Sequence, residues 1–320
     1  MTLRTKLGGG ALVFAVVCLA GWSLIADSSF SSRLRRHLPR AVRKFFTTRP
    51  APSPRLAKLP KIYLWAWERP EDMQFLGNGK VGVAFLAKTI YLTGSPSTAD
   101  GAELEAAHIR PRMQPLRIVP GTPLMAVVRI ESLRGALPGA YANNNASPAS
   151  FSSEQTSRIA NEIAATTKID GVNALQIDFD ATMSEHVFYR DLLIEVRKLL
   201  PTNFPLSITA LASWCIGDRW LAELPPGTID EAVPMLFRMG TGTREVTTYL
   251  AAGNNFTVPA CTTSLGLSTD EPFSRDILAG KIAIGDTSSN AIRVYIFSPH
   301  SWEQSATQKL LEEYQSWRAN

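Results

Sequence analysis

The sequence contains little cysteine, with three residues in a chain of 320. Cys18 lies in an apolar N-terminal stretch, which leaves Cys215 and Cys261 in the body of the protein. These two fall near opposite ends of their predicted strands, so we expect no disulfide between them. A domain that does not depend on disulfides leaves its cellular compartment open.

Motifs for several kinds of chemistry are also missing. His37, His108 and His186 show no metal-ligand spacing with acids or cysteines, which argues against a metal site. Ser184 and Ser213 lack the histidine and aspartate partners of a hydrolase triad. No Gly-rich phosphate loop follows the first predicted strand. We therefore expect neither a metal ion nor a cofactor.

The net charge of +5 is concentrated in one segment of the chain. Between the N-terminal apolar stretch and the main body lie seven basic residues, namely Arg33, Arg35, Arg36, Arg40, Arg43, Lys44 and Arg49. Without them the remaining chain is close to neutral or acidic. The basic balance therefore describes a tether, and we expect no nucleic-acid partner.

Residues 8–26 form an uncharged, apolar run that follows Arg4 and Lys6. About 19 such residues span a bilayer as a helix. A cleaved signal peptide is the alternative, but no small-x-small cleavage site follows the run. We therefore interpret residues 1–27 as an uncleaved transmembrane signal anchor. Residues 28–60, which are basic and then rich in proline, are predicted to be a juxtamembrane linker.

The orientation of this anchor has two interpretations. The basic cluster after the anchor favours the cytoplasm, by the positive-inside tendency. One N-terminal helix before a large C-terminal domain instead favours export. We expect a single span in the inner membrane, with the C-terminal domain in the periplasm or outside the cell.

From residue 61 onward, short apolar runs alternate with helical patterns. The predicted strands are Ile62–Trp67, Val81–Leu86, Leu124–Glu131, Ala174–Asp180, Leu206–Ser213, Ala232–Phe237, Ala260–Leu265 and Ile292–Ser298. Most are continuously apolar, as parallel strands covered by helices are. Eight strands with intervening helices over roughly 260 residues match a (β/α)8 TIM-like barrel at residues 61–320. A doubly wound open sheet is the main alternative.

Two aspartates share one face of the fourth predicted strand. Because side chains alternate along a strand, Asp178 and Asp180 point the same way, roughly 7 Å apart along the backbone. Ile177 and Phe179 fill the opposite, apolar face. Two acids on the inner face of a core strand are costly unless they are hydrogen-bonded, ion-paired or partly protonated. This arrangement indicates a functional site.

Other charged and aromatic residues follow the ends of predicted strands, where a barrel carries its catalytic groups. They are Trp65, Trp67, Glu68, Arg129, Glu131, Trp214, Arg238 and Trp302. Tryptophan with carboxylates suits a sugar, since the C–H face of the ring stacks on an indole and acids act on the glycosidic oxygen. Each group also has a structural interpretation. Trp65 or Trp67 would belong to the core, and Arg129 with Glu131 would be a buried ion pair.

Seven strings of the sequence resemble an uncharacterised bacterial family known only as a domain of unknown function. The strings are Tyr63–Asp72, Val81–Ala87, Arg110–Leu116, Val128–Ser132, Leu175–Ala181, Ser207–Cys215 and Glu231–Gly240. The resemblance covers most of the body and implies a membrane-attached or exported barrel. It implies no particular activity.

More distantly, the fourth strand is similar to the Asp-x-Asp-x-Glu motif of chitinase-type glycosidases. Asp178 and Asp180 match the two aspartates, but Thr182 stands where that family has its glutamate proton donor. Around Phe237 and Arg238 the chain resembles that family's Met-x-Tyr-Asp, with phenylalanine for tyrosine and arginine for aspartate. The resemblance therefore implies that the proton donor and the groups assisting an N-acetyl substituent are absent.

The leading hypothesis is a membrane-anchored, glycoside hydrolase-like protein that acts on an envelope or extracellular polysaccharide. Asp180 is the predicted general acid, with its pKa raised by Asp178 beside it, and Glu131 is the second carboxylate. The predicted substrate-binding residues are Trp65, Trp67, Glu68, Arg129, Trp214, Arg238 and Trp302. The second hypothesis is a non-catalytic carbohydrate-binding barrel. The third is a structural envelope protein, in which Arg129 or Arg238 neutralises the aspartates.

Overall fold

The structure of the protein is a computed structural model, and the residues it describes are 52–77, 79–94, 107–132, 149–284 and 292–319. The predicted anchor at residues 1–27 and most of the predicted linker lie outside these ranges. None of the helices within the described ranges is both long and apolar enough to cross a membrane.

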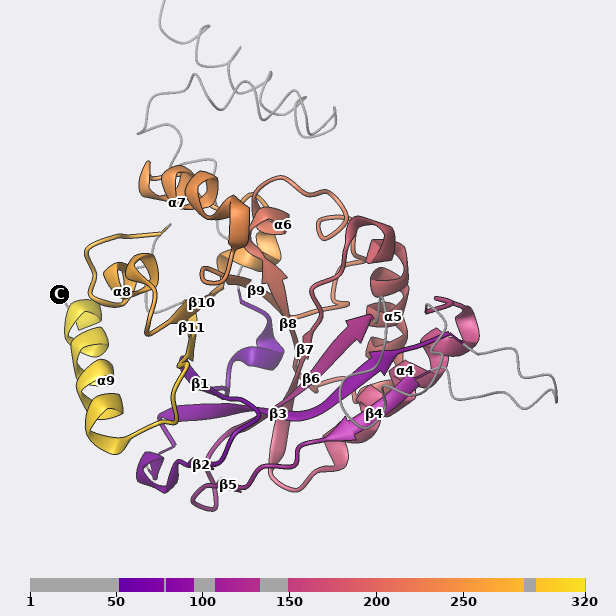
Figure 1. Ribbon diagram of the computed structural model, residues 1–320, viewed down its shortest axis with the longest axis horizontal. Coiled ribbons are helices and arrows are strands. Elements are labelled where there is room, and N and C mark those ends of the chain that lie inside the picture. Colours follow the sequence, from indigo (N-terminus) through magenta and orange to yellow (C-terminus); the bar gives the residue numbers. More distant parts are fainter. Residues whose placement is uncertain (1–51, 78, 95–106, 133–148, 285–291, 320) are drawn as a thin grey trace, which may run out of the picture. The chain divides into compact units, whose positions relative to one another are not determined.

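Eight parallel strands form a closed barrel (Figure 1). In barrel order they are β1 (Ile62–Ala66), β3 (Val81–Leu92), β6 (Leu124–Ser132), β7 (Val172–Asp178), β8 (Leu206–Leu211), β9 (Glu231–Met235), β10 (Ser264–Ser268) and β11 (Arg293–Phe297). The first strand pairs in parallel with both β3 and β11, which closes the sheet. The predicted barrel is confirmed, and closure rules out the doubly wound alternative.

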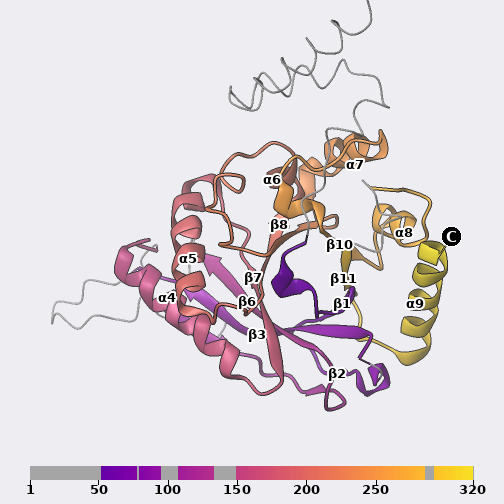
Figure 2. The ribbon, with the colours of Figure 1, turned by 180° about the vertical axis from the view of Figure 1, so that it is seen from behind.

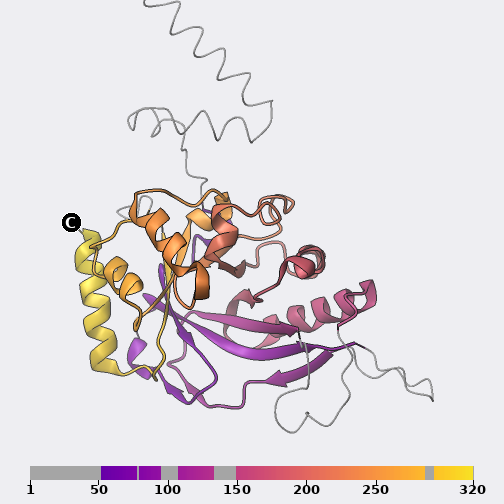
Figure 3. The same cartoon turned by 45° about the horizontal axis from the view of Figure 1, so that its top comes forward.

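Helices cover the outside of this barrel. They are α4 (Ser153–Ala165), α5 (His186–Leu199), α6 (Ala212–Ile216), α7 (Thr243–Ala251), α8 (Pro272–Leu278) and α9 (Gln304–Ala319). The short 3-10 turns are η1 (Pro54–Leu56), η2 (Gln74–Leu76), η4 (Thr166–Lys168), η5 (Met183–Glu185), η6 (Gly240–Gly242) and η7 (Pro259–Thr262). The last helix, α9 (yellow), lies on the opposite side of the barrel from α4 and α5 in the three ribbon views (Figures 1, 2 and 3).

Capping residues begin two of these helical segments. Thr182 and Glu185 form a reciprocal capping box at η5, just before α5, in which the carboxylate of Glu185 accepts from the backbone and the hydroxyl of Thr182. The Ser152 hydroxyl accepts from the backbone of Gln155 at the start of α4. These contacts satisfy backbone N–H groups that have no partner inside the helix.

One extra strand lies outside the barrel order. Strand β3 runs past the end of β1, with a bulge between Leu86 and Lys88, and its upper half pairs with the antiparallel β4 (Ala107–Pro111). A two-stranded parallel pair, β2 (Glu71–Asp72) with β5 (Leu116–Arg117), lies beside this part of the barrel.

The barrel interior is filled by stacked aromatic rings. Tyr295 stacks on Tyr63 at 5.3 Å and on Trp65 at 5.4 Å between ring centroids. These rings need glycine opposite them, because a Cβ atom at Gly82 would lie 2.3 Å from the Tyr63 ring. The carboxylate of Glu231 accepts from the Tyr295 hydroxyl and from Arg293 inside the barrel. Because the Glu231 carboxylate has hydrogen-bond donors on both oxygens, it holds the Tyr295 ring, and the rings stacked on it, in a fixed position below the cleft.

The end of the predicted linker is part of the barrel. Leu56 and Leu59 are buried against the interior cluster, and the Arg293 guanidinium donates to the Leu56 carbonyl at 2.9 Å. Arg55 forms an ion pair with Asp230 at 2.9 Å. Apolar burial therefore begins before residue 61, because η1 closes the N-terminal end of the barrel.

A disulfide joins Cys215 and Cys261, whose Cα atoms lie 5.7 Å apart. The expectation that these cysteines stay unpaired is wrong. Neither of them lies on a strand, since Cys215 is in α6 and Cys261 is in η7. The loop before η7 returns to α6, where the backbone N–H of Thr257 donates to the Cys215 carbonyl at 2.8 Å.

Candidate active site

A cleft of about 310 Å³ opens at the carboxyl ends of the barrel strands. Four aromatic side chains line it, namely Trp65, Trp67, Phe237 and Phe297. Its polar and charged side chains include Arg129, Asp178, Asp180, Thr209 and Arg238. Parallel strands in a closed barrel bring their carboxyl ends to one mouth, so residues far apart in sequence meet here.

Asp178 and Asp180 both face this cleft. Asp178 ends β7 and is half-buried, whereas Asp180 lies just beyond the strand and is exposed. The Thr209 hydroxyl of β8 donates to Asp178 at 2.7 Å. The alternation of side chains on β7 thus places both carboxyls on the cleft side, as the sequence predicts.

Burial is the main cause of the raised pKa of both acids. It brings the pKa of Asp178 to about 6, aided by the negative charge of Asp180 and opposed by the Thr209 hydroxyl and Arg129. The residue Asp180 is exposed at the mouth, but its carboxyl is partly desolvated by the surrounding cleft, which raises its pKa, and Arg129 opposes that shift. The sequence attributed the shift of Asp180 to its neighbour, whereas burial is the largest cause for both groups. Because the two groups interact, they titrate as a pair.

We predict that Asp178→Asn stabilises the protein near neutral pH. The folded state holds the Asp178 proton up to a pKa of about 6, while the unfolded chain releases it near 3.8. The ionised carboxylate therefore disfavours the fold, and stability falls as pH rises from about 4 to 6. A shift of this size corresponds to at most about 3 kcal/mol. The asparagine variant should gain up to that amount over wild type between pH 4 and pH 8, measured by urea unfolding of the full chain.

An exposed aspartate in the turn before β7 gives the matched control for this measurement. Asp170→Asn should leave the difference between pH 4 and pH 8 unchanged from wild type, since Asp170 lies in water. An equal stability of Asp178→Asn relative to wild type at both pH values would show that burial does not penalise the Asp178 carboxylate.

Glu131 is held by Arg129 rather than placed in the cleft. Its carboxylate forms an ion pair with Arg129 at 2.8 Å, and each side chain is about one third exposed (36% and 33%). Arg129 lines the cleft, and its guanidinium carbon lies 5.7 Å from the centre of the Trp67 ring. The ion pair that the sequence offered as an alternative is present, although it is not fully buried. Glu131 does not line the cleft itself, although its charge acts on both Asp178 and Asp180.

Arg238 lines the cleft but does not neutralise either aspartate of β7. Its guanidinium pairs with Asp270 at 2.7 Å and with Glu271 at 2.8 Å. Its backbone is in the left-handed region, with φ of 54°, and its N–H also donates to Glu271. Both arginines of the cleft thus have carboxylate partners of their own.

Trp65 forms the floor of the cleft. It is 3% exposed, and its indole N–H donates to the Gln176 side chain at 2.8 Å. Phe237 meets it edge-on at 5.9 Å and stacks on Phe297 at 5.5 Å. Trp67 is more exposed than Trp65 and is the tryptophan better placed to meet a ligand.

Three predicted substrate-binding residues lie outside the cleft. Trp214 is 4% exposed and packs on the outer side of the sheet with His186 and Trp220. The Trp214 side chain points outward because β8 ends at Leu211 and α6 begins at the next residue, so the alternation of the strand no longer applies. A sugar platform must be accessible, so the prediction for Trp214 is wrong.

Trp302 and Glu68 support the backbone around the first strand. Trp302 is 7% exposed, and its indole N–H donates to the Trp65 carbonyl at 2.9 Å. Glu68 accepts from the Met113 backbone at 3.1 Å and lies 3.6 Å from Arg110. Neither residue lines the cleft, so their predicted contact with substrate is not supported.

The sequence did not single out Thr209, Phe237 and Phe297 as site residues. Phe237 and Phe297 sit at the carboxyl ends of their strands, on the same face as Met235 and Tyr295. Strand alternation is the signal that identifies this face. Within the described residues, no group of three or more histidine, cysteine or acidic side chains is arranged to hold a metal ion.

Fold and cleft together define a (β/α)8 barrel protein with an acidic, aromatic-lined mouth. No family model matches the chain, so its resemblance to a family of unknown function stays a prediction. No curated protein matches it either.

Three solved structures are similar to the chain at low sequence identity. A putative chitinase A from Streptomyces coelicolor is 11% identical, with 81% of this chain and 99% of that chain covered and a TM-score of 0.43. A chitinase from Rhizomucor miehei is 12% identical, with 80% and 99% covered and a TM-score of 0.42. The spore cortex-lytic enzyme of Bacillus cereus is 16% identical, with 65% and 51% covered and a TM-score of 0.35. At these values the site residues are interpreted from their own contacts alone.

Proposed function

We propose that this protein binds a polysaccharide in the cleft and cleaves it as a glycoside hydrolase-like enzyme. The observation that carries the proposal is the meeting of Asp178 and Asp180 with aromatic walls in one open cleft. A carboxyl with a raised pKa keeps its proton at higher pH and can donate it to a glycosidic oxygen. Indole and phenyl faces suit the C–H face of a pyranose ring.

Asp180 is assigned as the general acid because it is the more exposed carboxyl of the pair. Asp178 lies deeper, accepts from the Thr209 hydroxyl and interacts electrostatically with Asp180. Both acids come from one strand, so they lie on one side of the cleft, and Glu131 is occupied by Arg129. The nucleophile is then a water molecule, which releases its proton to solvent.

The lack of a second carboxylate positioned for catalysis favours a second candidate function, a non-catalytic carbohydrate-binding barrel. After the aspartates, the next carboxylate along the chain is Glu185, which is 3% exposed and accepts from Thr182 in the capping box. No second catalytic carboxylate therefore comes from this segment. Saturable glycan binding without turnover would favour this candidate.

The cellular setting is part of the proposal. The apolar run at residues 8–26 supports a single-span anchor in the inner membrane. The disulfide between Cys215 and Cys261 supports an oxidising compartment, the periplasm or the cell exterior, for the barrel. The substrate would then be an envelope or extracellular polysaccharide.

Incubation of the full-length protein with a panel of bacterial polysaccharides tests the proposal, with new reducing ends and product size as readouts. We expect cleavage of at least one polysaccharide, faster at pH 5 than at pH 8, because the acid must be protonated. Binding without any release of product would move the assignment to the second candidate. A complete absence of binding across the panel would overturn both.

A further inference from the structure

Arg112 lies where strand β3 changes its hydrogen-bonded neighbour from β1 to β4. Strand β1 stops pairing with β3 at Ala66, opposite Phe85, and β4 takes over from Lys88, opposite Pro111. The Arg112 backbone N–H donates to Ala87 at 2.9 Å, in the gap between the two pairings. Backbone carbonyls at the end of β1 thus lose their strand partner at this point and need another donor.

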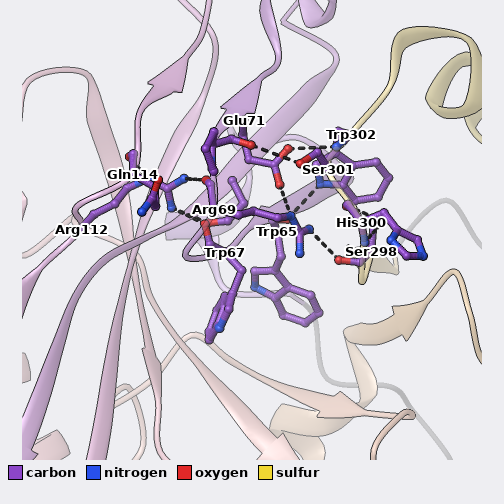
Figure 4. Close-up of polar contacts among 12 residues, drawn as sticks. Trp65, Trp67, Arg69, Glu71, Arg112, Gln114, Ser298, His300, Ser301 and Trp302 are labelled. Atoms are coloured by element: carbon purple, nitrogen blue, oxygen red, sulfur yellow. Dashed lines mark hydrogen bonds and ion pairs between the residues drawn. The ribbon is translucent and has the colours of Figure 1, made fainter. Parts of the chain in front are cut away.

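The guanidinium of Arg112 supplies these donors (Figure 4). One terminal nitrogen donates to the Trp67 carbonyl at 2.5 Å and to the Ala66 carbonyl at 3.2 Å. The other donates to the Arg69 carbonyl at 2.6 Å, and Nε donates to Gln114 at 2.8 Å. An arginine fork has fixed geometry, so four carbonyls bound by one group are held at fixed positions relative to each other.

We propose that Arg112 is a positioning residue that holds Trp67 in the cleft. Its contacts fix the backbone of Ala66, Trp67 and Arg69, and Trp67 is the half-buried aromatic wall that also faces Arg129. Trp65 has a separate support, since its carbonyl accepts from the Trp302 indole. The effect of Arg112 on ligand affinity therefore passes through Trp67. This inference rests on the proposed function for its ligand.

A double-mutant cycle on the full-length protein tests this role. The probe is the β-1,4-linked hexasaccharide of N-acetylglucosamine, and its dissociation constant is measured by calorimetry. Arg112→Met should weaken binding about tenfold, and Arg112→Lys, which keeps the charge but loses the fork, should restore little. Arg112→Met should weaken binding much less in a Trp67→Ala background, because the two residues act in series. Arg117→Met is the matched control, since Arg117 is exposed and its ion pair with Asp72 is 3.8 Å long.

A second measurement reports the position of Trp67 without any ligand. Acrylamide quenching of tryptophan fluorescence is measured in the protein with Trp67 and in the Trp67→Phe variant. The difference between the two isolates the signal of the Trp67 indole. Arg112→Met should make that indole more accessible at a temperature where the protein stays folded. A lower melting temperature with unchanged quenching and additive effects on binding would overturn the inference. If Trp67→Ala leaves hexasaccharide binding unchanged, or if the wild-type protein does not bind the hexasaccharide, the proposed contact between Trp67 and the ligand fails. The quenching measurement alone then decides whether Arg112 positions Trp67.

Discussion

Asp180→Asn should reduce polysaccharide cleavage by roughly 10²- to 10⁴-fold, the range typical for the loss of a general acid. The amide has nearly the same shape as the carboxyl, and Asp180 makes no side-chain ion pair among the contacts of the described residues. We therefore expect the dissociation constant for the uncleaved polysaccharide to change by less than about threefold. The loss would appear in kcat and in kcat/KM alike, as it does for an interaction made only in the transition state. Reducing-end release and calorimetry on the full chain measure the two quantities.

Glu131→Gln gives the informative comparison for this prediction. Glu131 is paired with Arg129 and does not line the cleft, so its variant should keep most of the activity. If Glu131→Gln is as inactive as Asp180→Asn, Glu131 is the second catalytic carboxylate after all. Cleavage by Asp180→Asn at the wild-type rate would refute the assignment of the general acid.

The pH profile adds an independent check on the same acids. With a pKa of about 6 for Asp178, the pair holds a proton at pH 5 and loses it by pH 8. Activity that needs the proton should therefore fall with rising pH around 6. Removing the Thr209 hydroxyl, which favours the ionised form, should move this fall to higher pH.

Strand positions were predictable because most barrel strands are short runs of buried, mainly apolar residues. The inward face of β7 followed directly from the alternation of Ile177 and Phe179 with the two aspartates. A closed barrel then brings Asp178 to Arg129 of the neighbouring strand, with which it is in register. Local pattern and barrel geometry were sufficient for this part of the site.

Residues just after strand ends were not predictable in the same way. Trp214 and Trp302 follow β8 and β11 by a few residues, and in that distance the chain turns outward. One residue of α-helix rotates the side-chain direction by about 100°, so a boundary error of two residues decides whether an indole faces the cleft or the outer core. The support given by Arg112 was equally hidden, because it depends on where β1 ends relative to β3.

Loss of the disulfide should be the most damaging change to stability. Replacing both Cys215 and Cys261 by serine opens a loop of 46 residues, for which chain-entropy reasoning gives about 4 kcal/mol. For a domain of this size that amounts to a fall in melting temperature of roughly 10 °C. Ala212 and Ser213 of α6 line the cleft, but both cysteines are buried in the core and do not, so glycan affinity should be retained at temperatures where the variant is folded. Calorimetric melting of the variant and of wild type, each with and without reductant, measures the effect, and only wild type should respond to the reductant.

The same pair of cysteines reports where the barrel resides. Acid is added to intact cells to stop thiol–disulfide exchange, and the denatured chain is then returned to neutral pH and labelled with a maleimide polymer. An exported domain should carry one label, on Cys18, without reduction and three labels after reduction. Reducing cytoplasm would leave all three thiols free from the start, since disulfides rarely persist there. Three labels without reduction would therefore refute the proposed export, and a stability loss in the serine variant would then describe only the oxidised, purified protein.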